Sequence, residues 1–443
     1  MEGKNISNGG VYMKKGLVGG ILVLLSLAIM AQTVTLEVWQ VGMGNEAIDL
    51  LQGIIEEDFT SKTGIRVRLR VFAWSDMQNK VLLAAASGDT PDIVSGAPDH
   101  MVEYGVRDAI IDLKQSFGKE RVQAVESNLY PGTTHSLNFR GRVFGFVETC
   151  GVISAFYRHD ILNEQGLEIP KTWEDLEKLM PKLQSRGKNA GWNYGGVALS
   201  PKYGAYVLMK QNGGGWVEGE TFKSLLLEQG SIVGFTKYCN LYTHYKMPLE
   251  GDAFTLFKTG EWPVLFNINV FHATLTQAAP EITGKWTLGL IPGTKQPDGS
   301  VSHESFMGGS TLAIFKNSKY KEAAFKYLEW YLSDKIQTRL TEAIMTTIPG
   351  TMWVSGNKAA ASAMNIPEKD RKTLFLQLAQ SKTFSYFPGS LAIQRELDFA
   401  IMNVLQKNIT PLEALKSAAK ATETELARKQ KEYQRYLDKM LFN

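Results

Sequence analysis

Apolar and polar residues follow a regular order along the first part of the chain. They alternate along residues 33–41 and again, strictly, along residues 65–71, which is the pattern of a half-buried strand. Between these segments, residues 46–59 place aliphatic side chains on one face of a helix. A second helix is predicted for residues 75–86 and a short strand for residues 92–94. This strand–helix–strand–helix–strand order predicts a parallel sheet whose faces are covered by helices.

In such sheets, ligands bind beyond the carboxyl ends of the strands. The residues that end a predicted strand or open the next helix are therefore expected at the edge of a site: Trp39, Gln40, Trp74, Gly96, Ala97 and Pro98. For each aromatic residue, plain core packing is the alternative.

A second informative segment lies between residues 138 and 160. A turn at residues 139–142 is followed by an apolar run, a polar break at residues 148–151, and a β-rich run at residues 152–157. Two interpretations stay open at this point. The break is either a crossover between two lobes, and so a hinge, or the turn of an ordinary hairpin.

The first 31 residues have the order of a secretory signal. Two lysines precede an uncharged run at residues 16–30, and Ala31 ends it. The run is shorter than the roughly 20 residues that a membrane-spanning helix needs. We therefore expect a signal peptide at residues 1–31, with an uncleaved anchor as the alternative and Met13 as a second possible start. No cysteine follows the run, so a lipid-anchored lipoprotein is not expected.

Composition limits the function classes. After the signal, about 410 residues remain, which is too long for one core and suits two domains. Hydrophobic content of 44%, charged content of 21% and a net charge of +3 describe an ordinary globular chain without a basic field for nucleic acid. Cys150 and Cys239 could form one disulfide in an exported protein, or be two buried thiols.

Several motifs resemble those of one known family. Asp-Ile-Leu, Gly-Leu and Pro-Lys-Thr-Trp-Glu-Asp-Leu between residues 160 and 176 are similar to a signature of ABC-transporter extracellular solute-binding proteins, family 1, the maltose-binding-protein-like, sugar-binding type. Residues 88–94, 260–266, 308–328 and 410–415 resemble four further motifs in the family's order. Two of the motifs also have a local physical reason, because Thr172 and Thr410 are placed to cap the helices that follow them.

The resemblance implies an α/β, periplasmic-binding-protein-like fold of two α/β lobes with a hinge of three crossovers. The crossings would lie at residues 148–151, near residues 303–307 and near residue 349. The corresponding boundaries are 1–31 for the signal peptide, 32–147 and 307–349 for lobe 1, and 148–306 and 350–443 for lobe 2.

A sugar ligand would need aromatic planes for its weakly apolar faces and planar amides or carboxylates for its hydroxyls. The chain supplies nine tryptophans and sixteen tyrosines. Glu148 in the predicted hinge could accept two hydroxyl bonds, and Asn267 and Asn269 would share one side of a strand. The candidate ligand-binding residues, each with structural packing as its alternative, are Trp39, Gln40, Asn45, Trp74, Asp99, Glu148, Trp216, Trp262, Asn267, Asn269, Gly309 and Trp353.

No catalytic, cofactor or metal motif stands out. Cys150 and His159 lack a surrounding motif for a thiol dyad, and the glycines at residues 213–215 are not followed by the Lys-Ser/Thr of a phosphate loop. Cys239 and His244 lack further ligands for zinc. We therefore expect no enzyme activity, no cofactor and no metal.

The resemblance implies an exported, periplasmic or extracellular binding component of an ABC importer. It would capture a carbohydrate, expected to be an oligosaccharide, and deliver it to membrane permease subunits, acting as a monomer. Two alternatives stay open: a secreted carbohydrate-active enzyme, which would form product from glycans, and a binding module for a sensor kinase. The sequence does not identify the sugar.

Overall fold

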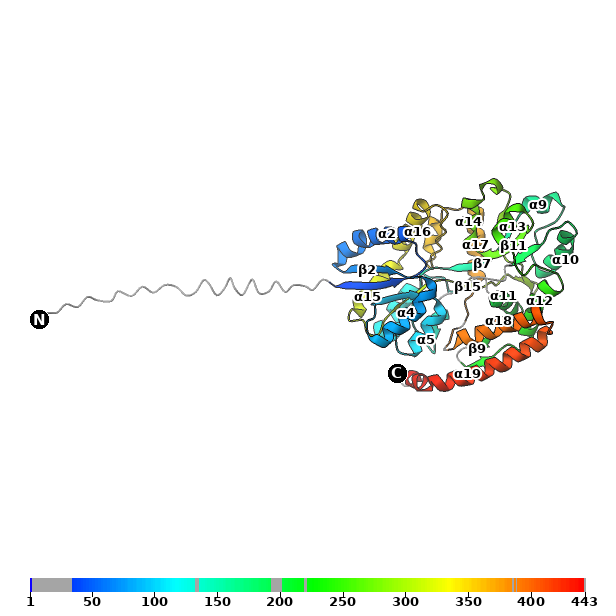
Figure 1. Cartoon of the computed structure of the whole chain (residues 1–443). Coiled ribbons are helices and arrows are strands. Elements are labelled where there is room, and N and C mark those ends of the chain that lie inside the picture. The colour runs from blue at the N-terminus through cyan, green and yellow to red at the C-terminus, as the bar shows by residue number, and fades with distance from the viewer. Residues whose placement is uncertain are drawn as a thin grey trace.

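The structure is a computed structural model, and Figure 1 shows two α/β lobes side by side. It describes Met1 and residues 34–131, 135–192, 201–218, 221–384, 386–387 and 389–441. The expected signal peptide therefore lies outside the described residues, apart from Met1. Within the described ranges, no helix combines the length and the apolar character that crossing a membrane requires.

Lobe 1 is built on a five-stranded sheet of the kind that the sequence predicts. Its order is β2 (Arg66–Val71), β1 (Thr35–Gln40), β3 (Ile93–Gly96), β16 (Thr311–Ile314) and β6 (Phe146–Val147). β1 pairs in parallel with β2 and β3, whereas β16 runs antiparallel to β3 and β6. The predicted order of three strands and two helices is confirmed, and two strands from later in the chain complete the sheet.

The helices of lobe 1 follow the predicted apolar stripes. α2 (Asn45–Ile54) continues through a π-helical turn (Ile55–Thr60) into α3 (Ser61–Thr63), and α4 spans Trp74–Ser87. The stripe is buried, with Leu51 and Phe59 each 1% exposed. Gly64 ends the first helix with a φ of 70°, a left-handed conformation that glycine adopts without strain.

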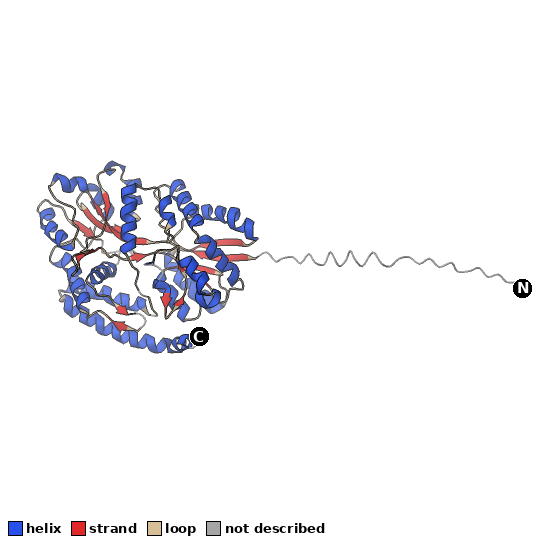
Figure 2. Ribbon diagram, turned by 180° about the vertical axis from the view of Figure 1, so that it is seen from behind, coloured by secondary structure: helices blue, strands red, loops and turns tan. Residues whose placement is uncertain are grey.

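Lobe 2 has its own five-stranded sheet. Its order is β12 (Thr287–Gly289), β7 (Gly151–Tyr157), β11 (Val264–Ile268) and β8 (Ala190–Trp192), and β15 (Met307–Gly308) also pairs with β7. Helices cover this sheet, and Figure 2 shows the strands of each lobe inside a layer of helices. The helices used below are α10 (Trp173–Gln184), α11 (Pro201–Gln211), α12 (Gln229–Thr243), α14 (Phe271–Ala278) and α17 (Glu368–Gln380).

Both predicted helix caps are confirmed. Thr172 Oγ1 accepts from the Asp175 N–H at 3.1 Å, and the Asp175 carboxylate accepts from the Thr172 N–H at 3.0 Å, which is a complete capping box. Thr410 and Glu413 form the same reciprocal pair at the start of α19 (Pro411–Leu441). The family motifs at these positions therefore fix helix starts.

The break at residues 148–151 is a crossover and not a hairpin turn. β6 lies in the sheet of lobe 1 and β7 in the sheet of lobe 2. The chain returns from β15 to β16 through Gly309 and Ser310, directly beside the first crossover, where Ser310 O accepts from the Glu148 N–H at 2.8 Å. Gly309 has a φ of 153°, and a Cβ there would lie 1.8 Å from Thr149 O. No other residue fits this close approach of two backbones.

The third crossing lies later than the sequence suggested. The N–H groups of Tyr130 and Lys358 donate to Gly356 O and Asn128 O, which holds residues 355–358 against lobe 1. The 3₁₀ helix Ala359–Ala363 then packs against α16 (Asp334–Thr347). Among the described elements that follow, α17 packs on β7 and β12 of lobe 2. We therefore infer that the chain leaves lobe 1 after residue 363 instead of near residue 349.

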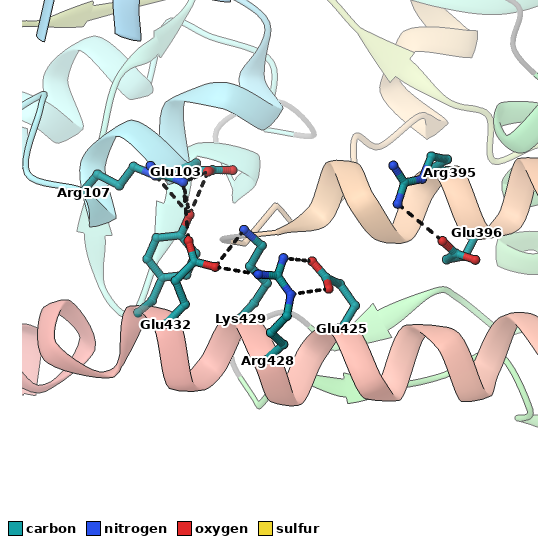
Figure 3. Close-up of polar contacts among 9 residues, drawn as sticks. Glu103, Arg107, Arg395, Glu396, Glu425, Arg428, Lys429 and Glu432 are labelled. Carbon is teal, nitrogen blue, oxygen red and sulfur yellow. Dashed lines mark hydrogen bonds and ion pairs between the residues drawn. The ribbon is translucent and has the colours of Figure 1, made fainter. Parts of the chain in front are cut away.

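The last helix connects the two lobes on the outside. α19 packs on α18 (Ser390–Lys407) and α12 of lobe 2, and its carboxyl-terminal part reaches α5 (Pro98–Val106) of lobe 1. Figure 1 shows it running beneath both lobes. At the contact in Figure 3, Arg107 Nε and Nη2 donate to Tyr433 Oη at 3.0 and 2.6 Å, and Tyr433 donates to Glu103 at 2.8 Å. Tyr433 is 1% exposed.

Removing the Tyr433 hydroxyl should loosen this contact. Tyr433→Phe is expected to lower the free energy of unfolding by roughly 1 to 2 kcal/mol, because a buried hydrogen bond to charged groups is lost. Urea denaturation measures the change. Tyr436→Phe on the same helix is the matched control and should change stability by less than about 0.5 kcal/mol. Equal effects of the two variants would show that the hydroxyl contact contributes nothing.

Candidate functional site

Glu148 is one of the fully buried residues among the predicted site residues. It is 0% exposed, and its Oε1 accepts from Gln40 Nε2 and from Tyr331 Oη, each at 2.6 Å. Its Oε2 accepts from Ser310 Oγ at 2.9 Å and from Ser95 Oγ at 3.4 Å. Glu148 therefore joins β1, β3, the second crossover and α15 (Lys321–Tyr331) at the base of the lobes.

Burial raises the pKa of Glu148 above its ordinary value, and the hydrogen bonds from Tyr331, Ser310, Gln40 and Ser95 oppose this shift. Both of its oxygens are occupied by protein donors. The arrangement suits a structural clamp beside the crossovers, and it leaves no free lone pair facing a ligand. Gln40, predicted alongside it, is 2% exposed and belongs to the same clamp.

One cavity lies in lobe 1 at the carboxyl end of β1, where the parallel order places a site edge. This lobe-1 cavity has a volume of about 290 Å³ and is lined by residues 42–44, the start of α2 at residues 45–47, Ile344, Ile348, Thr351 and Trp353. It brings together two predicted residues, Asn45 and Trp353. Trp74 lies next to it, since a Cβ on Gly42 would be 3.2 Å from the Trp74 ring, and Trp74 is 45% exposed.

A second cavity, in lobe 2, is walled by aromatic rings. This aromatic cavity has a volume of about 210 Å³, and its lining includes Tyr206, Lys210, Trp216, Glu218, Phe384, Tyr386, Phe387, Ser390 and Gln394. Trp216 stacks on Phe384 with ring centroids 4.0 Å apart, and the edge of Tyr206 meets Trp216 at 5.0 Å. Phe384 also stacks on Phe306, which directly precedes β15. The wall of the cavity is thus continuous with the second crossover.

Trp216 is the one residue of this cavity among the candidates that the sequence predicts. Phe384, Tyr386 and Phe387 were missed, although aromatic residues directly before a Pro-Gly turn signal are a feature that the sequence shows. Tyr206 was missed because it lies within α11. An aromatic residue inside a helix is normally interpreted as a core residue.

Four of the predicted site residues have structural roles, because they contact the backbone or pack against other side chains. Asn269 Oδ1 accepts from the Val152 N–H at 2.8 Å, and Asn267 Oδ1 accepts from the Ile268 N–H at 2.8 Å, so both amides are used at the hinge end of β11. Gly309 forms the close crossover described above. Trp39 is half-buried and meets the edge of Phe72 at 5.0 Å. Asp99 lies in the first turn of α5, and its side chain is outside the described part of the structure.

Trp262 lies apart from the other candidates. It precedes β11 at the end where Val264 pairs with Tyr157, which is the end of β7 remote from the crossover. Its ring is 4% exposed and packs against Gly191 and Gly251, where an added Cβ would lie 2.0 and 2.5 Å away. These are the surroundings of a core side chain, and we leave Trp262 out of the proposed site.

Trp262→Ala is accordingly expected to affect stability and not binding. Loss of the buried ring should lower the free energy of unfolding by roughly 3 to 5 kcal/mol. The affinity of the folded variant for its ligand should stay within about twofold of the native value, a difference below roughly 0.4 kcal/mol. Urea denaturation and calorimetry measure the two effects. A tenfold loss of affinity would return Trp262 to the site.

The two cysteines are free and buried, so the second of the two sequence alternatives holds. Burial raises the pKa of Cys150 to about 12 and raises that of Cys239 as well. Neither thiol is therefore a reactive thiolate at neutral pH. Among the described residues, no group of three His, Cys, Asp or Glu side chains is arranged to hold a metal ion.

Comparison with known proteins decides the family. The model of the family "Bacterial extracellular solute-binding protein" matches residues 45–338. The chain belongs to this family. The resemblance predicted from the sequence motifs is thereby confirmed.

Individual solute-binding proteins show the same relationship. The chain is 25% identical to the diacetylchitobiose binding protein DasA of Streptomyces coelicolor over 329 residues, which is 70% of this chain and 72% of that protein. It is 24% identical to the maltodextrin-binding protein MdxE of Bacillus subtilis over 305 residues, or 63% and 66% of the two chains. The solved sugar-binding protein MalE of Xanthomonas citri superposes with a TM-score of 0.75 at 19% identity, covering 90% of this chain and 99% of that one. The predicted α/β, periplasmic-binding-protein-like fold is confirmed.

Proposed function

We propose that this chain is the exported substrate-binding component of an ABC importer. It captures a carbohydrate, in our view an oligosaccharide, between its two lobes and delivers it unaltered to permease subunits in the membrane. Membership of the solute-binding family supports this role. The names of the relatives support a sugar ligand, because diacetylchitobiose and maltodextrin are both oligosaccharides.

The observation that carries the proposal is the position of the aromatic cavity. Its Trp216–Phe384 stack continues through Phe306 to β15, and so reaches the crossover on which one lobe would turn against the other. Aromatic planes suit the CH faces of sugars, and Lys210, Ser390 and Gln394 supply polar groups beside them. Sugar contacts made only in the closed state would shift the lobes toward closure.

The carboxylates of the aromatic cavity and of the lobe-1 cavity favour binding over cleavage at these two places. Glycoside hydrolysis needs a pair of carboxyl groups that flank the scissile bond. Among the described lining residues, the aromatic cavity has Glu218 alone and the lobe-1 cavity has Glu46 alone, and both are exposed. Glu148 is fully occupied by protein donors. We therefore prefer a monomeric binding protein in the periplasm or at the cell envelope to a secreted enzyme.

A thermal-shift screen of the chain without its signal segment against a panel of oligosaccharides tests the proposal. At 100 times its Kd a ligand adds about 2.7 kcal/mol to stability, which is a readily measured shift. At least one sugar should raise the melting temperature and be recovered intact by chromatography. Cleaved products would favour the enzyme alternative. The absence of any stabilising sugar would contradict the carbohydrate proposal.

A further inference from the structure

Two side chains of the aromatic cavity carry buried donors that lack an acceptor. Trp216 is 7% exposed and Gln394 is 2% exposed, and both line the cavity. Within the described part of the protein, neither Trp216 Nε1 nor Gln394 Nε2 has a hydrogen-bond partner. Buried polar groups are nearly always paired in proteins, so two orphaned donors in one cavity call for an explanation.

Lobe 2 contains another buried Trp–Gln pair, and the side-chain donors of this pair have hydrogen-bond acceptors. Trp173 is 0% exposed, and its Nε1 donates to Gln211 Oε1 at 2.8 Å. Gln211 is 1% exposed, and its Nε2 donates to Glu304 O at 2.9 Å and to Pro292 O at 3.3 Å. Buried tryptophan and glutamine side chains can therefore be paired in lobe 2, whereas Trp216 Nε1, like Trp39 Nε1 and Trp353 Nε1 of lobe 1, has no partner among the described residues.

A third donor group, the ammonium group of Lys210, belongs to the lining of the same cavity. Lys210 comes from the last turn of α11, and no ion pair of its ammonium group is found among the described residues. Among the described lining residues the carboxylate is that of Glu218, which is exposed and accepts from Thr221 Oγ1 at 2.5 Å. Three donor groups, an indole N–H, an amide NH₂ and an ammonium group, thus belong to residues that line this cavity.

We propose that the aromatic cavity binds a sugar substituent with an sp² oxygen, either the carbonyl of an acetamido group or the carboxylate of a uronic acid. This inference rests on the proposed carbohydrate function. Such an oxygen has two lone pairs and brings no proton of its own, so it can satisfy Trp216 and Gln394 together. A site built to hydrogen-bond a substituent strongly rejects the analogue that lacks it. The cavity would therefore select substituted sugars over plain ones.

Calorimetry with three β-1,4-linked disaccharides tests this selection: cellobiose, N,N′-diacetylchitobiose and cellobiouronic acid. One of the two substituted sugars should bind at least tenfold more tightly than cellobiose. Trp216→Phe keeps an aromatic plane without the N–H, and Gln394→Met keeps the length without the amide; each should reduce the preference to less than threefold. Lys210→Met should weaken the binding of the uronic acid only. This variant therefore distinguishes a carboxylate from an acetamido carbonyl as the group that the cavity binds.

Trp286→Phe, which removes an indole N–H elsewhere in lobe 2, is the matched control and should leave the preference intact. Cellobiose binding as tightly as both substituted sugars would overturn the inference while leaving carbohydrate binding in place. A preference that survives both Trp216→Phe and Gln394→Met would overturn it too. If no sugar of the wider panel binds, the proposed function fails, and this inference fails with it.

A second measurement needs no ligand. Removing an unpaired buried donor should not destabilise the empty protein, whereas removing a paired one should. Gln394→Met is therefore expected to melt at or above the native temperature, and Gln211→Met, equally buried but fully paired, several degrees below it. A similar fall in both variants would show that Gln394 has a partner in the empty protein and would overturn the inference.

Discussion

Replacing Glu148 with alanine is expected to lower the free energy of unfolding by roughly 3 to 5 kcal/mol. The variant leaves the buried donors of Gln40, Tyr331 and Ser310 without their acceptor, and each unpaired buried donor costs roughly 1 to 3 kcal/mol before relaxation. Because these donors come from β1, α15 and the second crossover, the loss also loosens the base of the lobes. Urea denaturation measures the change, and native-like stability of Glu148→Ala would contradict the clamp.

Glu148→Gln is the matched control for this experiment. Its carbonyl oxygen can still accept from Gln40 and Tyr331, and its amide can donate to the serine hydroxyls, so the loss of stability at neutral pH should be much smaller. Because the pKa of Glu148 is raised in the folded protein, its protonation stabilises the fold. This contribution is fully present below the ordinary glutamate pKa of about 4.3 and is lost as the pH rises through the raised value.

The native protein should therefore lose stability relative to Glu148→Gln as the pH is raised above about 4.3. Denaturation curves of both proteins across a pH series test the sign. Parallel pH dependences would show that Glu148 does not titrate differently in the folded and unfolded states.

Trp216→Ala is expected to weaken the best carbohydrate ligand by at least about tenfold, or roughly 1.4 kcal/mol. The variant removes the ring that stacks on Phe384 and lines the aromatic cavity, and with it the apolar area and the stacking geometry that an aromatic plane provides. Calorimetry on folded protein, checked by circular dichroism, measures the change. Trp262→Ala, a core tryptophan of the same lobe, is the comparison, and equal affinities of both variants would remove Trp216 from the site.

The alternation of strands and helices could be predicted from the sequence because it is a local property. The alternation at residues 33–41 and 65–71 predicts two strands, and β1 and β2 lie within these ranges. Thr172 and Thr410 cap the expected helices. The break at residues 148–151 could not be decided locally. A hairpin and a crossover share its pattern, and the outcome depends on pairing of β6 with β16, more than 160 residues later.

The site was harder to predict, because its members are separated along the chain. Trp216 and Trp262 both follow glycine or polar residues in the sequence, yet distant partners decide their roles. Phe384 brings Trp216 into a cavity wall, whereas Gly191 leaves room for the Trp262 ring in the core. Glu148 was correctly placed beside the crossovers, but its protein donors come from segments as distant as Tyr331 and are not visible in the local sequence.

The third crossing shows the same dependence on distant contacts. Pro349 and Gly350 predict a boundary between the two lobes, and the chain does turn there. Hydrogen bonds from Tyr130 and Lys358 then keep the following segment on lobe 1. A local break in the sequence therefore marks the end of α16, and we propose that the passage between lobes follows residue 363.

A crystal structure of the protein with its best oligosaccharide tests the central claim most directly. The account predicts an intact sugar between the two lobes, with one ring or substituent in the aromatic cavity beside Trp216 and contacts from lobe 1 on its other side. A sugar held by one lobe alone on an outer surface, or a sugar found cleaved, would contradict it.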